Sequence, residues 1–84
     1  MRTRSEQDYV AAIIEVCSEF FSADDISDQD NFFMLGGTSL NAVELTEELL
    51  ARHGVVLPLD AIFASDTLAE LAGHCASDVN APDA

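Results

Sequence analysis

One stretch governs how this chain is organised: Asp30-Asn31-Phe32-Phe33-Met34-Leu35-Gly36-Gly37-Thr38-Ser39-Leu40. Its paired glycines can adopt φ > 0 and let a bulky group approach the backbone closely. A strongly patterned helix is predicted to begin directly after them, so that its unpaired amides and the positive end of its dipole lie beside the Ser39 hydroxyl. Such a helix start favours a phosphate group. The stretch therefore predicts an attachment point at Ser39.

Gly36 to Ser39 also have a simpler interpretation, as an ordinary loop in which Thr38 or Ser39 caps a helix. The aromatic pair upstream, the flanking leucines and the position of the stretch in a short helical chain favour the attachment site instead.

Length and composition limit the classes of protein. Eighty-four residues suffice for one small domain with a single core, but not for a cleft between two lobes, so a self-contained enzyme is disfavoured. Hydrophobic residues make up 49% of the chain, which disfavours intrinsic disorder.

The net charge of −13, from 16 acidic and 3 basic residues, excludes nucleic acid as a direct partner, because the clustered cations that bind phosphates are missing. A strongly negative surface suits partners with basic patches. The alternative is that the acidity only keeps the protein soluble.

Cys17 and Cys75 are expected on apolar helix faces, as two buried free thiols and not a disulfide framework. No apolar run reaches membrane-spanning length, and Met1-Arg2-Thr3-Arg4 does not lead into a signal sequence. We therefore expect a cytoplasmic protein with no membrane association.

Hydrophobic spacing predicts a first helix over residues 5–21, started by a capping box of Ser5 and Asp8. Its buried stripe comprises Val10, Ile13, Ile14, Cys17, Phe20 and Phe21. A loop of about seventeen residues follows, and loops that long tend to be functional. Its apolar residues, Ile26, Phe32, Phe33 and Leu35, are expected to pin it across the helices.

The second helix is predicted from Ser39 to His53, with Gly54 as its C-terminal stop. Steps of about 100° per residue place one broad inward face on Ala42, Val43, Leu45, Thr46, Leu49 and Leu50. Leu40 falls on the outward side beside Glu44 and Glu47. An exposed apolar side chain bordered by carboxylates is typical of a binding patch, although a lone exposed leucine is also common.

Pro58 interrupts the helical pattern, and residues 60–64 can form a short helical turn that carries Ile62 and Phe63 inward. A last helix is predicted from Asp66 or Thr67, with Thr67 and Glu70 as a capping box. Leu68, Leu71, Ala72 and Cys75 form its buried side.

The stretch 30–40 resembles the phosphopantetheine-attachment motif of carrier proteins, specifically the peptidyl carrier (thiolation) type of nonribosomal peptide assembly. The resemblance extends over residues 8–76. It implies an all-α fold, a small four-helix bundle of three main helices and one short helix with a long first loop. The expected organisation is a flexible N-terminus 1–4, a carrier domain 5–76 and a flexible C-terminal tail 77–84. The resemblance is to a free-standing carrier. The position before the serine is often His or Asp in carrier families but is Thr38 here.

The resemblance further implies that Ser39 carries a covalent 4'-phosphopantetheine, with Gly36, Gly37 and Thr38 forming the site around it. Its implied partners are a phosphopantetheinyl transferase, an adenylating enzyme that loads an aminoacyl group, and downstream condensing or tailoring enzymes. These would meet a monomer through Met34, Leu40, Glu44, Glu47 and the short helix near Ile62.

Two alternatives stay open. Acyl carrier proteins of fatty-acid or polyketide synthesis usually have an aspartate before the serine, so Gly36, Gly37 and Thr38 favour the peptidyl type. An acidic helical adaptor or inhibitor without a prosthetic group is the alternative from another class.

Catalytic and metal motifs fail on particular residues. A hydrolase nucleophile elbow needs glycine two positions after the serine, where Asn41 stands. His53 and His74, the candidate bases, lie near predicted helix ends, where histidine commonly stabilises the helix dipole. The cysteines and histidines lack structural-zinc spacing, the acidic loop from Asp24 to Asp30 lacks the glycine of an EF-hand, and a Walker loop needs a lysine that this chain does not have.

Overall fold

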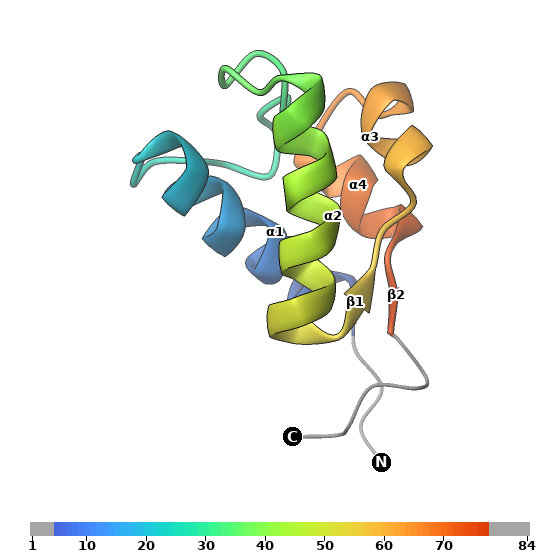
Figure 1. Cartoon of the computed structure of the whole chain (residues 1–84). Helices are drawn as coiled ribbons and strands as arrows, with labels where there is room; N and C mark the ends of the chain where they lie inside the picture. Colours follow the sequence, from blue (N-terminus) through green and yellow to red (C-terminus); the bar gives the residue numbers. More distant parts are fainter. Residues whose placement is uncertain (1–4, 78–84) are drawn as a thin grey trace.

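A bundle of four helices, joined at one end by a two-stranded ribbon, makes up the part of the chain that the computed structural model describes, residues 5–77 (Figure 1). In chain order the elements are α1 (Glu6–Phe21), α2 (Ser39–His53), β1 (Val55–Val56), α3 (Leu59–Ala64), α4 (Leu68–His74) and β2 (Ala76–Ser77). The expected all-α bundle with one short helix and a long first loop is therefore confirmed, and α3 is the short helix.

Local capping explains where the first two helices begin and end. Ser5 and Asp8 form the expected capping box at the start of α1, each side chain accepting from the other residue's backbone N–H. At the end of α2, Gly54 takes the left-handed conformation (φ 64°), and its N–H donates to the carbonyls of Leu49 and Leu50.

The capping box expected for α4 is only half formed. The Thr67 hydroxyl accepts from the Glu70 N–H at 3.2 Å, as predicted. The Glu70 carboxylate, however, accepts from the N–H of Asp66 at 2.6 Å and not from that of Thr67. Thr67 is thus the N-cap as predicted, and only the reciprocal bond of Glu70 goes to the residue before it.

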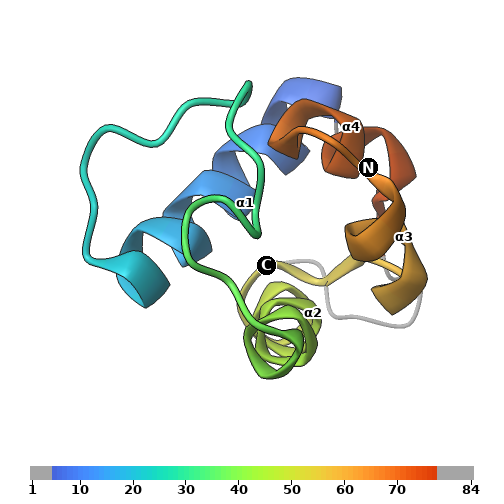
Figure 2. The same ribbon diagram turned by 90° about the horizontal axis from the view of Figure 1, so that it is seen from above.

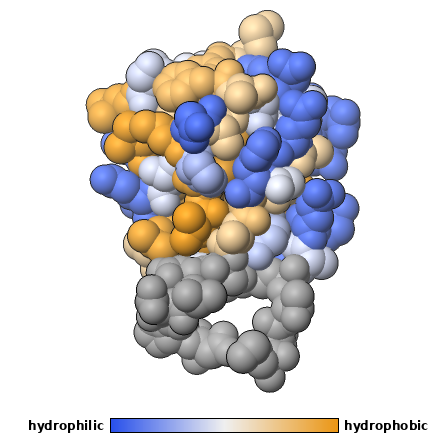
Figure 3. All heavy atoms as spheres, turned by 90° about the vertical axis from the view of Figure 1, so that its right-hand side faces the viewer, coloured by the Kyte–Doolittle hydropathy of each residue, from blue (hydrophilic) through white to orange (hydrophobic). Residues whose placement is uncertain are grey.

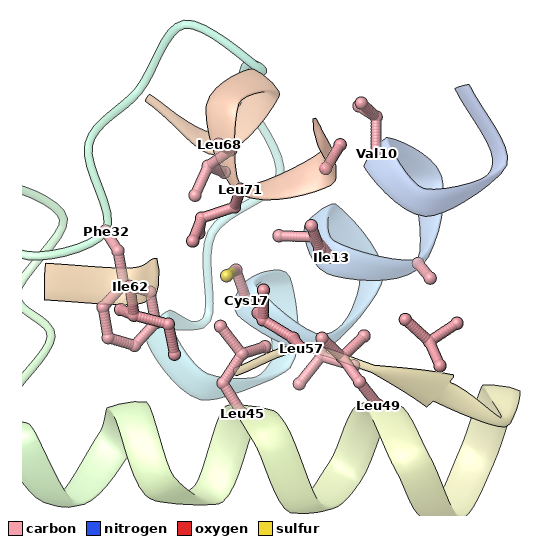
Figure 4. Close-up of a cluster of buried hydrophobic side chains, with 14 of the residues drawn as sticks. Val10, Ile13, Cys17, Phe32, Leu45, Leu49, Leu57, Ile62, Leu68 and Leu71 are labelled. Carbon is pink, nitrogen blue, oxygen red and sulfur yellow. The ribbon is translucent and has the colours of Figure 1, made fainter. Parts of the chain in front are cut away.

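The core is entirely apolar among the described residues and receives side chains from all four helices (Figure 4). α2 packs against both α1 and α3 and lies between them in the side view (Figure 1). Seen from above, α2 stands end-on along one edge of the bundle (Figure 2). The largest fully buried side chains of the core are Ile13, Leu45, Leu49, Ile62, Leu68 and Leu71. This core fixes the direction of α2 and hence the position of its first residue.

The long loop between α1 and α2 is attached to the rest of the fold both by apolar side chains in the core and by backbone hydrogen bonds. Ile26 and Phe32 are buried in the core, and Phe33 and Leu35 pack against it, as expected. The loop backbone also binds the start of α4, where the N–H of Leu68 donates to the Asp30 carbonyl at 2.9 Å. The loop is therefore an ordered part of the fold.

Three apolar side chains expected in the core are exposed instead. Val43 and Leu50 on α2 have 37% and 46% of their surface accessible, and Phe63 on α3 has 53%. The buried face of α2 is narrower than the hydrophobic pattern suggests, because α3 spans only six residues and leaves this side of α2 uncovered.

The ribbon was not predicted. Val55 and Val56 of β1 pair antiparallel with Ser77 and Ala76 of β2, which ties the chain after α2 to the chain after α4. Ser77, expected as the first residue of a frayed tail, is thus in a strand. The rest of that expected tail, 78–84, and the expected flexible start, 1–4, lie outside the described residues.

Candidate functional site

Ser39 is the exposed first residue of α2, and its hydroxyl takes no part in the hydrogen bonds that cap the helix. The N-cap is Thr38, whose hydroxyl accepts from the Asn41 N–H and donates to Asn41 Oδ1, both at 3.1 Å. Asn41 Oδ1 also accepts from the Thr38 N–H at 3.1 Å. The interpretation of this turn as a helix cap is thus right for Thr38 and wrong for Ser39. Thr38 caps the helix, and the Ser39 hydroxyl remains exposed.

The amides next to the Ser39 hydroxyl are available to a ligand. Within residues 5–77, no group accepts from the N–H of Ser39 or Leu40, whereas the N–H of Ala42 already donates to the Thr38 carbonyl at 2.9 Å. The first turn of α2 also contains no acidic residue, although the protein is so acidic overall. The start of a fifteen-residue helix therefore presents free donors and the positive end of its dipole beside the serine.

The two glycines before Thr38 serve different purposes. Gly36 has φ 111°, a conformation that side chains disfavour, and the space where a Cβ would lie is open. A Cβ on Gly37 would instead lie 2.5 Å from Cε2 of the Phe32 ring and 2.8 Å from the Phe32 carbonyl oxygen. Gly36 allows the turn, and Gly37 allows the close packing of that turn on the core.

The Asn31 side chain stabilises the loop before Gly36 through hydrogen bonds to the backbone. Its Oδ1 accepts from the N–H of Phe33 at 2.9 Å and of Met34 at 3.0 Å. Its Nδ2 donates to the Asp66 carbonyl at 2.9 Å, across a separation of 35 residues. Sequence reasoning missed this role, since the only local signal was an asparagine at a turn.

A chain of aromatic contacts fastens the same loop to two helices. Phe32 contacts Phe21 of α1 and Phe33, with ring centroids 5.6 and 5.4 Å apart. Phe33 in turn stacks on Phe63 of α3 at 5.4 Å, with the rings inclined by 23°. This contact of Phe63 was not predicted from the sequence, because the hydrophobic pattern placed the Phe63 side chain in the core.

Four of the five residues expected to meet partners are exposed. Met34 and Leu40 have 86% and 67% of their surface accessible, and Glu44 and Glu47 lie on the same outward side of α2. Ile62 is the exception, because its side chain is fully buried and cannot touch a partner in this structure. The short helix exposes Leu59 and Phe63 instead.

The residues considered for catalysis do not converge on Ser39. His53, at the far end of α2, places Nε2 3.2 Å from Glu15 of α1, and His74 is exposed at the end of α4. Residues 5–77 contain no group of three or more His, Cys, Asp or Glu side chains arranged to hold a metal ion. In the same part of the chain, no helix combines the length and apolar character needed to cross a membrane.

Both cysteines are free thiols, as expected, but only Cys17 is fully buried. Burial raises the pKa of the Cys17 thiol to about 12. Partial burial raises the pKa of the Cys75 thiol to about 11, and its Sγ donates to the Leu71 carbonyl at 3.5 Å. Both sulfurs are therefore protonated and weakly nucleophilic near neutral pH.

The sequence matches the family model for a phosphopantetheine attachment site over residues 9–75. It is 43% identical over 65 residues to malpibaldin synthetase of Mortierella alpina, a match that covers 77% of this chain and 1% of that protein. It is 41% identical over 78 residues to indigoidine synthase of Streptomyces lavendulae, covering 93% of this chain and 6% of that protein. It is 39% identical over 66 residues to the nonribosomal peptide synthetase hkm11 of Aspergillus hancockii, covering 76% and 5%.

The chain belongs to the phosphopantetheine attachment-site family. It is a carrier domain of the peptidyl type, homologous to the thiolation domains of nonribosomal peptide synthetases, and this family is generally non-catalytic. The chain spans only a few per cent of the length of these relatives. The matches favour the peptidyl type over an acyl carrier, and membership of the family argues against an adaptor without a prosthetic group.

Proposed function

We propose that Ser39 is the residue that carries 4'-phosphopantetheine, and that this chain is a substrate of its partner enzymes and not itself a catalyst. The single observation that carries the proposal is the exposed Ser39 hydroxyl at the first residue of α2, beside two free amides and left out of the cap that Thr38 makes. When attached, the prosthetic group supplies a thiol that holds an aminoacyl or related acyl group as a thioester.

The residues around Ser39 fit a phosphodiester. The amides of Ser39 and Leu40 can donate to its oxygens, and the helix dipole stabilises its negative charge by about 0.3–1 kcal/mol. Gly36 leaves open space on the loop side. The nearest acidic side chain along α2, Glu44, is one turn further on, and its carboxylate already accepts from Asn41 Nδ2 at 3.2 Å.

A phosphopantetheinyl transferase would carry out the attachment with its own base and magnesium ion. The Ser39 oxygen attacks the phosphorus of coenzyme A that bears the pantetheine, a P–O bond of the pyrophosphate breaks, and 3',5'-adenosine diphosphate leaves. The hydroxyl proton goes to the base of the transferase. The part of Ser39 is only to present its oxygen, which its exposure and the rigid turn before it allow.

The exposed residues nearest to Ser39 along the chain are proposed as the contact for partner enzymes. Met34 and Leu40 supply apolar anchors, and Glu44 and Glu47 supply charges that orient a basic partner. An adenylating enzyme would load the thiol, and condensing or tailoring enzymes would use the product. A tethered group delivers its cargo at high effective concentration, so weak contacts suffice.

The test is the intact mass of the purified protein after incubation with coenzyme A, magnesium and a broad-specificity phosphopantetheinyl transferase. Wild type should gain one phosphopantetheinyl group and Ser39→Ala none. Ser18→Ala, which removes a hydroxyl from the last turn of α1, is the matched control and should be modified like wild type. Unchanged modification of a folded Ser39→Ala variant would refute the proposal.

A further inference from the structure

Met34 is the most exposed of the large apolar side chains in the part of the chain that the structure describes. Such side chains are exposed on several elements, and hydrophobic side chains gather over one half of the face seen from the α3 side (Figure 3). The other large ones are leucine, valine and phenylalanine, which contain no sulfur. Met34, with 86% of its surface accessible, therefore presents a thioether to solvent in the loop that leads to Ser39.

Backbone hydrogen bonds fix the turn that contains Met34. The N–H of Met34 donates to Asn31 Oδ1 at 3.0 Å. The N–H of Gly37 donates to the Phe32 carbonyl at 3.2 Å, and Ser39 is two residues further on. Neither bond involves the Met34 side chain, so the chemistry of this side chain can change without opening the turn.

The two thiols of the described residues compete poorly for an oxidant. A thiol reacts with peroxides as its thiolate. Burial raises the pKa of the Cys17 thiol to about 12, and partial burial raises that of the Cys75 thiol to about 11, so both are protonated near neutral pH. The thioether of a methionine needs no deprotonation before it is oxidised. Exposure and chemistry therefore both direct oxidation to Met34.

The charge of the protein favours an uncharged oxidant. A net charge of −13 repels anions from the whole surface. A hydroperoxide is neutral near pH 7, and hydrogen peroxide is small enough to reach any exposed side chain. The class of oxidant that fits Met34 is therefore a hydroperoxide.

We propose that Met34 is a site of reversible oxidation by hydroperoxides, and that its sulfoxide slows the attachment of phosphopantetheine to Ser39. The second part of this proposal rests on the proposed function. A lone pair of the Met34 sulfur attacks the distal oxygen of the hydroperoxide, an S–O bond forms and the O–O bond breaks. The other oxygen takes up the hydroperoxide proton and leaves as an alcohol, or as water from hydrogen peroxide. The sulfur loses two electrons, and the peroxide gains them.

The reverse step needs a dithiol reductant, which methionine sulfoxide reductases supply. The sulfoxide returns to the thioether, its oxygen leaves as water, and the two thiols become a disulfide. Attachment of the prosthetic group at Ser39 then returns to its original rate, so the device responds to peroxide without destroying the protein.

The position of Met34 explains the effect on Ser39. Met34, five residues before the serine, and Leu40, one residue after it, are the large exposed apolar side chains nearest to Ser39 along the chain. A sulfoxide converts the first of them from apolar to polar. Losing part of the apolar burial of one such side chain corresponds to a contact about three- to tenfold weaker.

The experiment treats the unmodified full-length protein with hydrogen peroxide at pH 7 and then removes the peroxide. Mass spectrometry of peptide fragments locates each added oxygen, which separates Met34 from both cysteines and from Met1, a residue outside the described range. Treated and untreated proteins are compared as substrates of a broad-specificity phosphopantetheinyl transferase, with kcat and KM measured separately, and by urea unfolding. Met34→Leu, which stays apolar and has no sulfur, is the matched control, and Met34→Gln is a polar stand-in for the sulfoxide.

Within residues 5–77 the added oxygen should lie on Met34, and a methionine sulfoxide reductase with a dithiol should remove it. Oxidation should raise KM about three- to tenfold with kcat unchanged, as expected for the loss of a binding contact. The urea midpoint should stay the same, because the side chain lies outside the core. Met34→Gln should show the raised KM without peroxide, and Met34→Leu should match untreated wild type before and after treatment.

Oxygen on Cys17 or Cys75 before Met34, an unchanged KM for the oxidised protein, or a KM raised by peroxide in Met34→Leu as much as in wild type would each overturn this proposal. Failure of the proposed function has a different signature. In that case the transferase would not modify even the untreated wild-type protein, and the effect on Ser39 would fall with it, while the added oxygen would still be found on Met34.

Discussion

Replacing Gly37 by alanine should destabilise the protein, because the added Cβ has no room. It would lie 2.5 and 2.7 Å from two carbons of the Phe32 ring and 2.8 Å from the Phe32 carbonyl oxygen. A rotation of the ring could relieve the first two contacts but not the third, which is to backbone. The ring itself is buried and packed against Phe21 and Phe33, so it has little freedom to turn away.

The expected cost follows from this overpacking. Forcing an extra carbon into a filled site costs about 1–3 kcal/mol. A loss of about 2 kcal/mol lowers the Tm of a domain of this size by about 8–16 °C. The free energy of unfolding should fall accordingly in urea, with an unchanged m-value if only the native state is affected.

Gly73→Ala is the matched control, because its Cβ would meet only Glu6 Oε2, at an ordinary 3.5 Å. A glycine within a helix costs about 0.5–1 kcal/mol relative to alanine, so this variant should be more stable than wild type. Both variants are measured by thermal and urea unfolding, followed by far-UV circular dichroism. If Gly37→Ala unfolds at the same temperature as wild type, the close packing of this turn on Phe32 is not what requires the glycine.

The remaining predictions concern the loop, the ion pairs and the thiols. Asn31→Asp keeps an acceptor for the loop amides but cannot donate to a carbonyl, so urea unfolding should show a loss of about 1 kcal/mol, and unchanged stability would contradict the role of this residue. The Arg52 side chain lowers the pKa of Glu19, so the stability that this pair adds is present above the unfolded pKa of about 4.3 and is lost as pH falls through the folded value. Arg52→Gln should therefore be less stable than wild type at pH 7, with a difference that shrinks below about pH 4 and in high salt, and a difference independent of pH would contradict this. Cys17 and Cys75, with pKa values raised to about 12 and about 11, should react with iodoacetamide at pH 8 far more slowly in the folded protein than in urea, and equal rates would contradict their protection.

The helix boundaries could be predicted because their causes are local. Ser5 and Gly54 are separated from their bonding partners by only a few residues, so the sequence pattern contains the whole interaction. The same holds at the start of α2, although the pattern did not show whether Thr38 or Ser39 was the cap. Only the geometry of Asn41 decides that.

The errors arose where burial depends on what another element covers. Val43 and Leu50 fit the hydrophobic pattern of an inward face, yet α3 is too short to shield them. Phe63 was wrongly assigned to the core for a related reason, whereas Ile62 does point inward as predicted and was wrong only as a partner contact. A helix of six residues buries one side only, and the single-sequence pattern does not show which. The β1–β2 ribbon depends on pairing across about twenty residues, which no local signal indicates.

The candidate site was found from its motif, but the contacts that support it were not. The position of Ser39 follows from its glycines and the patterned helix after it. Asn31 and the packing of Phe32 on Gly37 could not be predicted in the same way, because they depend on distances between side chains and backbone in the folded chain.

The most direct test of the central claim is to locate the prosthetic group by fragmentation of the modified peptide that contains both Thr38 and Ser39. The Thr38 hydroxyl is engaged by Asn41, whereas the Ser39 hydroxyl is exposed and has no partner in residues 5–77. All of the added mass should therefore lie on Ser39. Phosphopantetheine on Thr38 or elsewhere, or none on the folded wild-type protein after exposure to an active transferase, would contradict the claim.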